Sequence, residues 1–180
     1  HLRVLPAYHT ERWTNQESAV GVILETNIMH NEGHPLNIGI TGDTRYQERM
    51  GRAFKDVQVL LLNIGSIEKE EGKFLGQHLG MCGCINLLKE ARLGKPLLAI
   101  LTEFGEEFDG RREVISTIIE NWAKPMNGHN HNLLRVIPAD VNLELRLTDL
   151  SIRETDTNVF FPYNKIDIEE GEILKYKFNG

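Results

Sequence analysis

The chain has 180 residues, of which 41% are hydrophobic and 7% are aromatic, the composition of an ordinary globular domain rather than a tail or a fibre. Its 20 Lys and Arg residues and 26 Asp and Glu residues give a formal net charge of -6, which argues against a surface built to neutralise a long nucleic-acid backbone. A polyanionic substrate would therefore have to bind through metal ions or through a few basic side chains positioned at the site.

The chain has only two cysteines, Cys82 and Cys84, separated by one glycine. This spacing fits neither a disulfide framework nor the C-x-x-C pattern of zinc knuckles, so we expect a reducing, cytoplasmic environment. No stretch approaches the roughly 20 apolar residues that cross a bilayer, and we expect no contact with a membrane. The chain starts at His1 without an initiator methionine and enters a strand-like run at once, so we expect a fragment or a processed product.

Short, partly β-branched segments separated by polar turns open the chain, at residues 2–8, 19–24 and 36–40. Their spacing predicts three successive strands in a meander. After the turn at Gly42 we expect a short polar helix over residues 46–54. The continuous apolar run at residues 57–62 is typical of a strand that is buried on both faces.

Two helices and one further buried strand are predicted next. Residues 79–93 carry apolar side chains three positions apart, and Gly94 and Pro96 end the pattern. Residues 97–101 predict a second buried strand. Residues 111–122 predict a second helix, whose apolar stripe consists of Val114, Ile115, Ile118, Ile119 and Trp122. The order strand, helix, strand, helix predicts a layered α/β arrangement.

The pattern changes after Pro125, where residues 127–132 predict a polar loop. Short strand-like segments follow at residues 134–137, 143–147, 158–161 and 173–178. We therefore expect a main domain over residues 1–124 and a small β-rich extension over residues 125–180 that packs on it.

The most informative motif is Ile40-Thr41-Gly42-Asp43-Thr44, in which an aspartate follows a predicted strand and a glycine that allows a sharp turn. Acidic side chains at such strand ends are well placed to bind a cation. Asp43 can equally cap the helix expected at residues 46–54, because Asp is a favoured N-cap residue. Spacing alone leaves both interpretations open.

Three more polar residues stand at similar positions. Asn63 and Glu103 each follow a predicted buried strand, and His78 precedes the first long helix. If these strands lie side by side, Asp43, Asn63 and Glu103 cluster at the carboxyl-end edge of the sheet, where α/β proteins usually bind ligands. His78 could reach the same edge as a proton donor, or it could cap the helix.

Five segments within about residues 1–124 stand in a characteristic order. They are residues 18–24, the motif around Asp43, residues 59–63, His78 with its helix, and residues 101–104. This order and spacing resemble the second half of the metallo-β-lactamase fold, and are most similar to the transfer-RNA 3′-processing nucleases and related phosphodiesterases and lactonases. The resemblance implies an α/β fold, the second half of an αββα sandwich, followed here by the β-rich extension.

The resemblance also implies roles for four residues. Asp43 would be the aspartate shared by two metal ions, His9 the family's middle metal histidine, and Glu103 would stand where the family has its last metal histidine. His78 would take the place of the proton-donating histidine and act in catalysis together with Asp43. Two divalent metal ions per complete site, Zn or Mn, would activate water to cleave a phosphodiester, a lactone or a similar ester.

One part of the family's pattern is missing. The main metal-binding signature, H-x-H-x-D-H, belongs to the first half of the family's fold, and this chain lacks it. His129 and His131 begin the pattern, but Leu133 and Leu134 stand where aspartate and histidine are needed. We therefore expect a carboxyl-terminal half that pairs with the amino-terminal half of the same protein, with another chain or with a second copy.

Two alternatives to the hydrolase remain open at this stage. A binding or regulatory module could keep the fold and lose catalysis, which the missing signature and Glu103 favour. Asp43, Asn63 and Glu103 could also be capping residues of an unrelated α/β domain. If the chain is a hydrolase, its acidic composition favours a small ester or a cyclic phosphodiester over long RNA.

Overall fold

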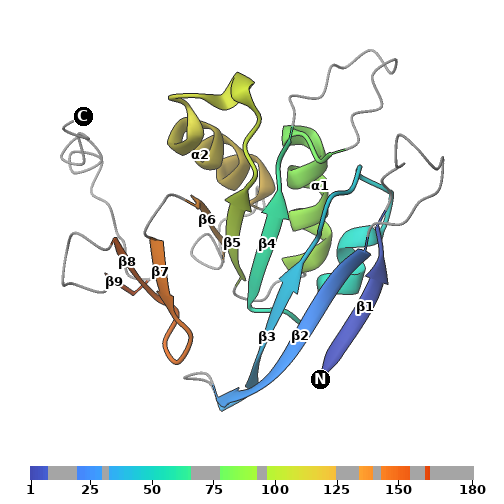
Figure 1. The fold of residues 1–180 in the computed structure, drawn as a ribbon, viewed down its shortest axis with the longest axis vertical. Coiled ribbons are helices and arrows are strands. Elements are labelled where there is room, and N and C mark those ends of the chain that lie inside the picture. Colours follow the sequence, from blue (N-terminus) through green and yellow to red (C-terminus); the bar gives the residue numbers. More distant parts are fainter. Residues whose placement is uncertain are drawn as a thin grey trace.

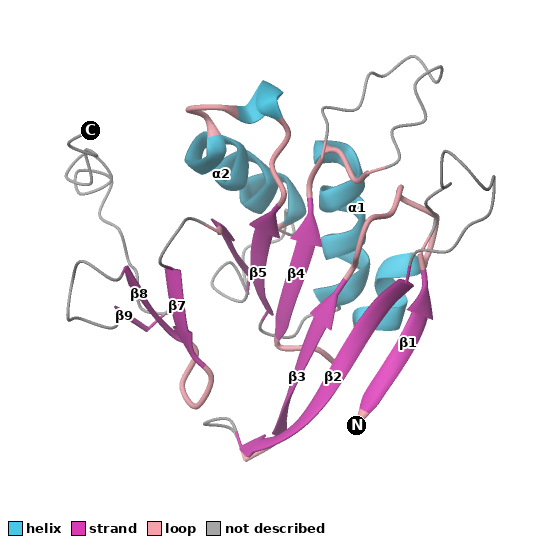
Figure 2. Cartoon of the chain, in the orientation of Figure 1, coloured by secondary structure: helices cyan, strands magenta, loops and turns pink. Residues whose placement is uncertain are grey.

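The structure is a computed structural model, and it describes residues 1–7, 20–29, 33–65, 78–92, 97–124, 134–139, 143–154 and 161–162. Figure 2 shows their secondary structure and draws the other residues in grey. The predicted features that lie outside the described residues include His9, the loop at residues 127–132, residues 158–160 of the strand expected at 158–161, and the strand at residues 173–178.

A six-stranded sheet organises the described part of the chain (Figure 1). Its spatial order follows the sequence, with β1 (Leu2–Pro6), β2 (Val20–Met29), β3 (Pro35–Ile40), β4 (Val59–Asn63), β5 (Leu97–Thr102) and β6 (Leu134–Pro138). The first three strands pair antiparallel, whereas β3, β4, β5 and β6 pair in parallel. The structure thus confirms the predicted meander and both buried strands.

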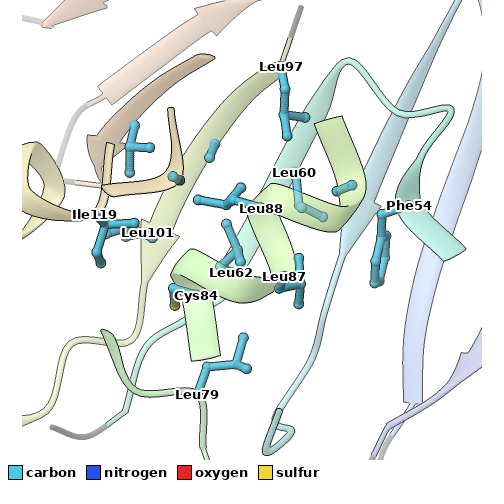
Figure 3. Close-up of a cluster of buried hydrophobic side chains, with 14 of the residues drawn as sticks. Phe54, Leu60, Leu62, Leu79, Cys84, Leu87, Leu88, Leu97, Leu101 and Ile119 are labelled. Carbon is cyan, nitrogen blue, oxygen red and sulfur yellow. The ribbon is translucent and has the colours of Figure 1, made fainter. Parts of the chain in front are cut away.

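Both α-helices of the described part pack on one face of this sheet (Figure 1). The helix α1 (Met81–Arg92) follows β4, and α2 (Arg112–Ala123) follows β5, so each belongs to a crossover between parallel strands. Figure 3 shows the apolar side chains between the helices and the strands, among them Leu60, Leu62, Leu79, Cys84, Leu87, Leu88, Leu101 and Ile119. Of the two cysteines, Cys84 packs in this core and Cys82 is exposed.

A smaller sheet covers part of the opposite face. It consists of β7 (Leu143–Arg146), β8 (Ser151–Glu154) and β9 (Phe161–Pro162), paired antiparallel. Leu150, in the turn before β8, packs in a second core with Leu36, Val59, Leu98 and Ile100 of the large sheet. The chain therefore has a mixed α/β architecture, with helices on one face of the sheet and a β-hairpin on the other.

The strands after residue 125 divide between the two sheets. β6 joins the large sheet, and β7, β8 and β9 form the small one. The strand β8 has a polar sequence, Ser151-Ile152-Arg153-Glu154, which is why no strand was expected there. The domain boundary after residue 124 stays a prediction. No helix within the described ranges is long and apolar enough to cross a lipid bilayer.

The helix predicted over residues 46–54 is shorter and of another type. The chain runs as an irregular loop into a 3₁₀-helix, η1 (Met50–Phe54), preceded by Arg49 with a left-handed backbone at φ 70°. Arg49 makes no side-chain cap hydrogen bond. Glu90 of α1 instead accepts hydrogen bonds from the backbone N–H groups of Arg49 and Gly51, at 3.0 and 2.9 Å. The local sequence could not show this cap because it comes from a distant residue.

The buried face of α2 is rotated relative to the predicted apolar stripe. The stripe predicts burial of Val114 and Trp122, but these residues are 59% and 63% exposed. The buried residues of α2 are Ser116, Ile119, Glu120 and Ala123. This rotation has a physical reason, because it turns the carboxylate of Glu120 toward the neighbouring strand β6.

Glu120 anchors α2 to β6, the last strand of the large sheet. Its Oε2 accepts the backbone N–H of Val136 at 2.8 Å. Its Oε1 lies 2.6 Å from Lys124 Nζ and 3.5 Å from Arg135 Nη1. The two cations offset the cost of burying the carboxylate, and the carboxylate satisfies an N–H at the edge of the sheet.

Replacing Glu120 with alanine should lower the free energy of unfolding by about 1–3 kcal/mol, because a buried N–H loses its acceptor. Denaturant unfolding followed by circular dichroism measures this change. Glu113→Ala, at an exposed position of the same helix, is the matched control and should cost no more than about 0.5 kcal/mol. Equal losses in the two variants would contradict the anchoring role of Glu120.

Candidate active site

Three parallel strands end at one edge of the large sheet, and a polar residue stands at or just beyond each end. The arrowheads of β3, β4 and β5 point to this edge, at the top of Figure 1. Asp43 comes shortly after β3, Asn63 is the last residue of β4, and Glu103 directly follows β5. The structure therefore brings together the three side chains that we expected at this edge.

The side-chain amide of Asn63 joins the two acidic side chains. Asn63 Nδ2 donates to Asp43 Oδ1 at 3.1 Å and to Glu103 Oε2 at 3.0 Å. An amide NH₂ group has two hydrogens, so one hydrogen can serve each carboxylate. Asn63 thus fixes the positions of two carboxylates that come from different strand ends.

Two threonines hold Asn63 in this orientation. Thr102 is its register partner on β5, and Thr102 Oγ1 donates to Asn63 Oδ1 at 2.8 Å. Thr41 Oγ1 accepts the backbone N–H of Asn63 at 3.3 Å. Ionised carboxylates only accept hydrogen bonds, so the NH₂ end of the amide must be the end that faces Asp43 and Glu103.

The proximity of Asp43 raises the pKa of Glu103 above its ordinary value. The largest cause is a hydrogen bond between the two carboxyl groups, followed by partial burial and by the negative charge of Asp43. His78 and Asn63 act in the opposite direction and lower the pKa of Glu103. The pair therefore holds a proton more readily than two separate carboxylates would.

The backbone of Glu103 adopts the left-handed conformation, with φ 53°. A residue with a side chain loses about 1–2 kcal/mol there relative to its preferred conformation. Such residues persist where the surrounding structure holds them, and they are frequent at functional sites. In this chain the hydrogen bond from Asn63 on the neighbouring strand holds Glu103.

The turn before Asp43 depends on Gly42. Gly42 has φ +63°, and a Cβ atom on it would lie 2.4 Å from the carbonyl oxygen of Val20. The helix that Asp43 was expected to cap does not form there, because η1 begins later and has Arg49 as its N-cap residue. The capping interpretation of Asp43 is therefore wrong, and its carboxylate accepts a hydrogen bond from Asn63.

His78 approaches the same carboxylate. Its Nδ1 lies 3.5 Å from Asp43 Oδ1, and 35% of its side chain is exposed. A backbone bridge between Ile64 and Leu79 places His78 beside the end of β4. A Cβ atom on Gly65 would lie 2.5 Å from Cγ of His78, so the absence of a side chain at Gly65 makes room for the imidazole.

Glu90 holds the loop that follows Asp43. In addition to the two N–H groups near η1, its carboxylate accepts the hydroxyl of Tyr46 at 2.8 Å. Burial and this hydrogen bond raise the pKa of Tyr46 to about 12, so the hydroxyl keeps its proton at neutral pH. The segment around Asp43 is therefore constrained on both sides, by Gly42 before it and by the contacts of Glu90 after it.

The predicted metal ligands come together in part. Asp43 and Glu103 are joined through Asn63, whereas His9 lies outside the described residues. Among the residues that the structure describes, no group of three or more His, Cys, Asp and Glu side chains is arranged to hold a metal ion. The complete ligand set of His9, Asp43 and Glu103 stays a prediction.

Sequence reasoning missed three residues of this site, Thr102, Gly65 and Glu90. Thr102 carried a usable signal, because it ends a strand on the same face of the sheet as Asn63 of the neighbouring strand. Gly65 and Glu90 carried none, because their partners are remote in sequence and only the fold brings them together.

Comparisons with known proteins give similarity to solved structures. No protein-family model matches the chain, and no curated protein matches its sequence. Among solved structures, the chain is similar to the metallo-beta-lactamase fold protein YhfI from Bacillus subtilis, with 18% sequence identity and a TM-score of 0.41. The match covers 58% of this chain and only 36% of YhfI.

Replacing Glu103 with glutamine should change how stability depends on pH. Because the pKa of Glu103 is raised, the folded state binds this proton more tightly than the unfolded state. The stability that this proton contributes is present below the ordinary Glu pKa and is lost as the pH rises through the raised value. We expect Glu103→Gln to be more stable than the wild type at neutral pH, with a smaller difference in acid.

Urea unfolding at a series of pH values, from about 4 to about 8, measures this dependence around the ordinary Glu pKa. Glu113→Gln, at an exposed position of α2, serves as the control. Its free energy of unfolding, plotted against pH, should run parallel to that of the wild type. A parallel curve for Glu103→Gln as well would show that the two carboxyl groups do not interact.

Gly65→Ala should move the imidazole of His78 away from Asp43, because the added methyl group would overlap the ring. Overpacking of this kind costs about 1–3 kcal/mol. The shift of the His78 ring signals in NMR spectra and the loss of thermal stability measure the two effects. In Gly110→Ala, where the new methyl group meets nothing within 4 Å, the His78 signals should stay in place.

Proposed function

We propose that this chain carries one half of a divalent-metal-dependent hydrolase centre of the metallo-β-lactamase kind, which cleaves a phosphodiester, a lactone or a similar ester. One observation supports this most strongly. The carboxylates of Asp43 and Glu103 meet at the carboxyl-end edge of parallel strands, with His78 beside them. This edge is where α/β sheets usually bind ligands.

The chemistry of the two carboxylates fits a divalent cation. Asp43 and Glu103 offer anionic oxygen atoms, which both Zn and Mn accept as ligands. Their closeness raises the pKa of Glu103, and a bound cation would relieve the repulsion between them. A site for two cations needs further ligands, which we assign to His9 and to the amino-terminal half of the same protein.

Bound cations would polarise the scissile ester or phosphoryl group and make a water acidic enough to attack near neutral pH. The residues of this chain position the other groups. Asn63 keeps the carboxylates of Asp43 and Glu103 in place, and the imidazole of His78 lies beside them, with its Nδ1 3.5 Å from Asp43 Oδ1. An imidazole at this position can carry a proton and donate it to the leaving oxygen.

The site is accessible to a substrate, and the charge of the chain favours a small one. The side chains of His78 and Asp43 are 35% and 41% exposed, so a substrate can reach both of them. The net charge of -6 disfavours a long polyanion, because the 26 acidic side chains of the chain outnumber its 20 basic ones. A small ester or a cyclic phosphodiester fits these properties best.

The uncovered part of the large sheet supports pairing with an amino-terminal half. On the face opposite the helices, the side chains of Leu2, Val4, Val20 and Leu24 are between 42% and 64% exposed. They form one patch, because β1 and β2 pair along this stretch. Burying such a patch stabilises an assembly by about 25 cal/mol per Å².

A non-catalytic binding or regulatory module is the second candidate, and the contacts of Asn63 favour it. The amide already donates to both carboxylates, so the cluster is satisfied without a cation. In such a module, substitution of Asp43 would change neither metal content nor activity.

Titration with Mn²⁺ or Zn²⁺ separates the two candidates. A hydrolase centre predicts that one of these cations raises the melting temperature of the wild-type chain, because a ligand that binds only the folded state stabilises it. Asp43→Asn should abolish this rise, together with any hydrolysis of a chromogenic phosphodiester or lactone. Asp109→Asn, a change at an exposed aspartate, should preserve both. An unchanged cation response and unchanged hydrolysis in Asp43→Asn would favour the module.

A further inference from the structure

Asn63 takes no chemical part in the proposed hydrolysis, yet its side chain contacts both carboxylates of the site. We propose that Asn63 is a positioning residue, whose amide holds Asp43 and Glu103 in one arrangement before a cation binds, and that Thr102 fixes the direction of this amide. The inference rests on the proposed function, because it explains how the same site is organised in advance.

When both are ionised, the two carboxylates repel each other, and a bridge is needed to keep them together. Both side chains are partly exposed and could turn apart into water, where their charges interact weakly. Nδ2 of Asn63 lies 3.1 Å from Asp43 Oδ1 and 3.0 Å from Glu103 Oε2. One nitrogen atom therefore donates a hydrogen bond to each of the two carboxylates. Donation to an ionised acceptor is stronger than donation to a neutral one, so this bridge favours the close arrangement.

Thr102 fixes the bridge from the neighbouring strand. Its Oγ1 lies 2.8 Å from Asn63 Oδ1, the amide atom that does not face the carboxylates. Asn63 and Thr102 are the last residues of β4 and β5 and are direct register partners. A positioning pair on two paired strands is more rigid than one on loops, and rigid support is what a preorganised site requires.

The backbone at this edge has its own hydrogen bonds, independent of these side chains. The N–H of Ile64 donates to the carbonyl oxygen of Thr102 at 2.8 Å. The N–H of Thr41 donates to the carbonyl oxygen of Leu61 at 3.0 Å. Removal of the Asn63 amide or the Thr102 hydroxyl should therefore leave the ends of the strands paired and change mainly the positions of the carboxylates.

Isothermal titration of the full chain with Mn²⁺ tests the inference. Residues that orient metal ligands typically contribute a factor of about 10–100 to metal affinity. We expect Asn63→Ala to weaken Mn²⁺ binding by about that factor, and Thr102→Val to weaken it less, because the amide remains but loses its orientation. Thr102→Ser keeps the hydroxyl and should restore the affinity of the wild type.

The double variant shows whether Thr102 acts through Asn63. If it does, Asn63→Ala combined with Thr102→Val binds Mn²⁺ no more weakly than Asn63→Ala alone, because the hydroxyl has no amide left to orient. The proposal would be overturned if the double variant weakened Mn²⁺ binding by the product of the two single factors. Unchanged Mn²⁺ affinity in Asn63→Ala would also overturn it.

Asn37→Ala is the matched control. Asn37 is a half-buried asparagine of β3 whose Nδ2 donates to the carbonyl oxygen of Asp56 at 3.2 Å, near the opposite edge of the sheet. Its loss should lower thermal stability and leave the affinity for Mn²⁺ unchanged. Equal weakening of Mn²⁺ binding by Asn37→Ala and Asn63→Ala would reduce the role of Asn63 to general stability, contrary to the proposal.

NMR of the side-chain amide of Asn63 in the absence of any cation separates this inference from the proposed function. We expect slow hydrogen exchange of its two N–H protons, and faster exchange in Thr102→Val. If this result holds while the wild type binds no Mn²⁺, the positioning role stands and the proposed function fails. Rapid exchange in the wild type, as for an amide in water, would overturn the positioning role whatever the affinity for Mn²⁺.

Discussion

The parallel pairing of β3, β4 and β5 is the constraint on which the candidate site depends. Because these strands run in one direction, the chain leaves each of them at the same edge of the sheet. The helices cover one face of the strands and the hairpin covers part of the other. A shift of one residue in the register would turn the buried side chains to the wrong face, so both cores enforce the pairing. The meeting of Asp43, Asn63 and Glu103 is a consequence of that register.

The site gathers features that do not favour stability by themselves. Two acidic side chains share one donor, Glu103 has a left-handed backbone, and the turn before Asp43 tolerates only glycine. The surrounding structure holds them in place through the amide of Asn63 and the contacts of Glu90 with the loop. Unfavourable local arrangements that a rigid frame maintains are typical of functional sites. This contrast supports a functional role for the edge of the sheet.

The sequence predicted the parts of the fold that depend on local patterns. The apolar runs around Leu60 and Leu98 indicated buried strands, and both strands lie inside the large sheet, with a neighbouring strand on each side. The positions of Asp43, Asn63 and Glu103 after predicted strands also indicated correctly that these three residues would meet at one edge of the sheet. The misplaced helix before Phe54 and the rotated face of α2 share one cause, a carboxylate that accepts a backbone N–H remote in sequence. Glu90 of α1 binds N–H groups at η1, and Glu120 of α2 binds the N–H of Val136 in β6. Such contacts leave no local pattern.

The central claim is that Asp43 and Glu103 form one interacting pair held by Asn63, and NMR titration of the side-chain carboxyl carbons tests it most directly. The account predicts that the Glu103 carbon titrates above the ordinary pKa of glutamate, and that the Asp43 carbon shifts over the same pH range. Replacement of Asn63 by alanine should change both curves, because the shared donor is lost. Two independent titrations at ordinary values, unaffected by Asn63→Ala, would contradict the account.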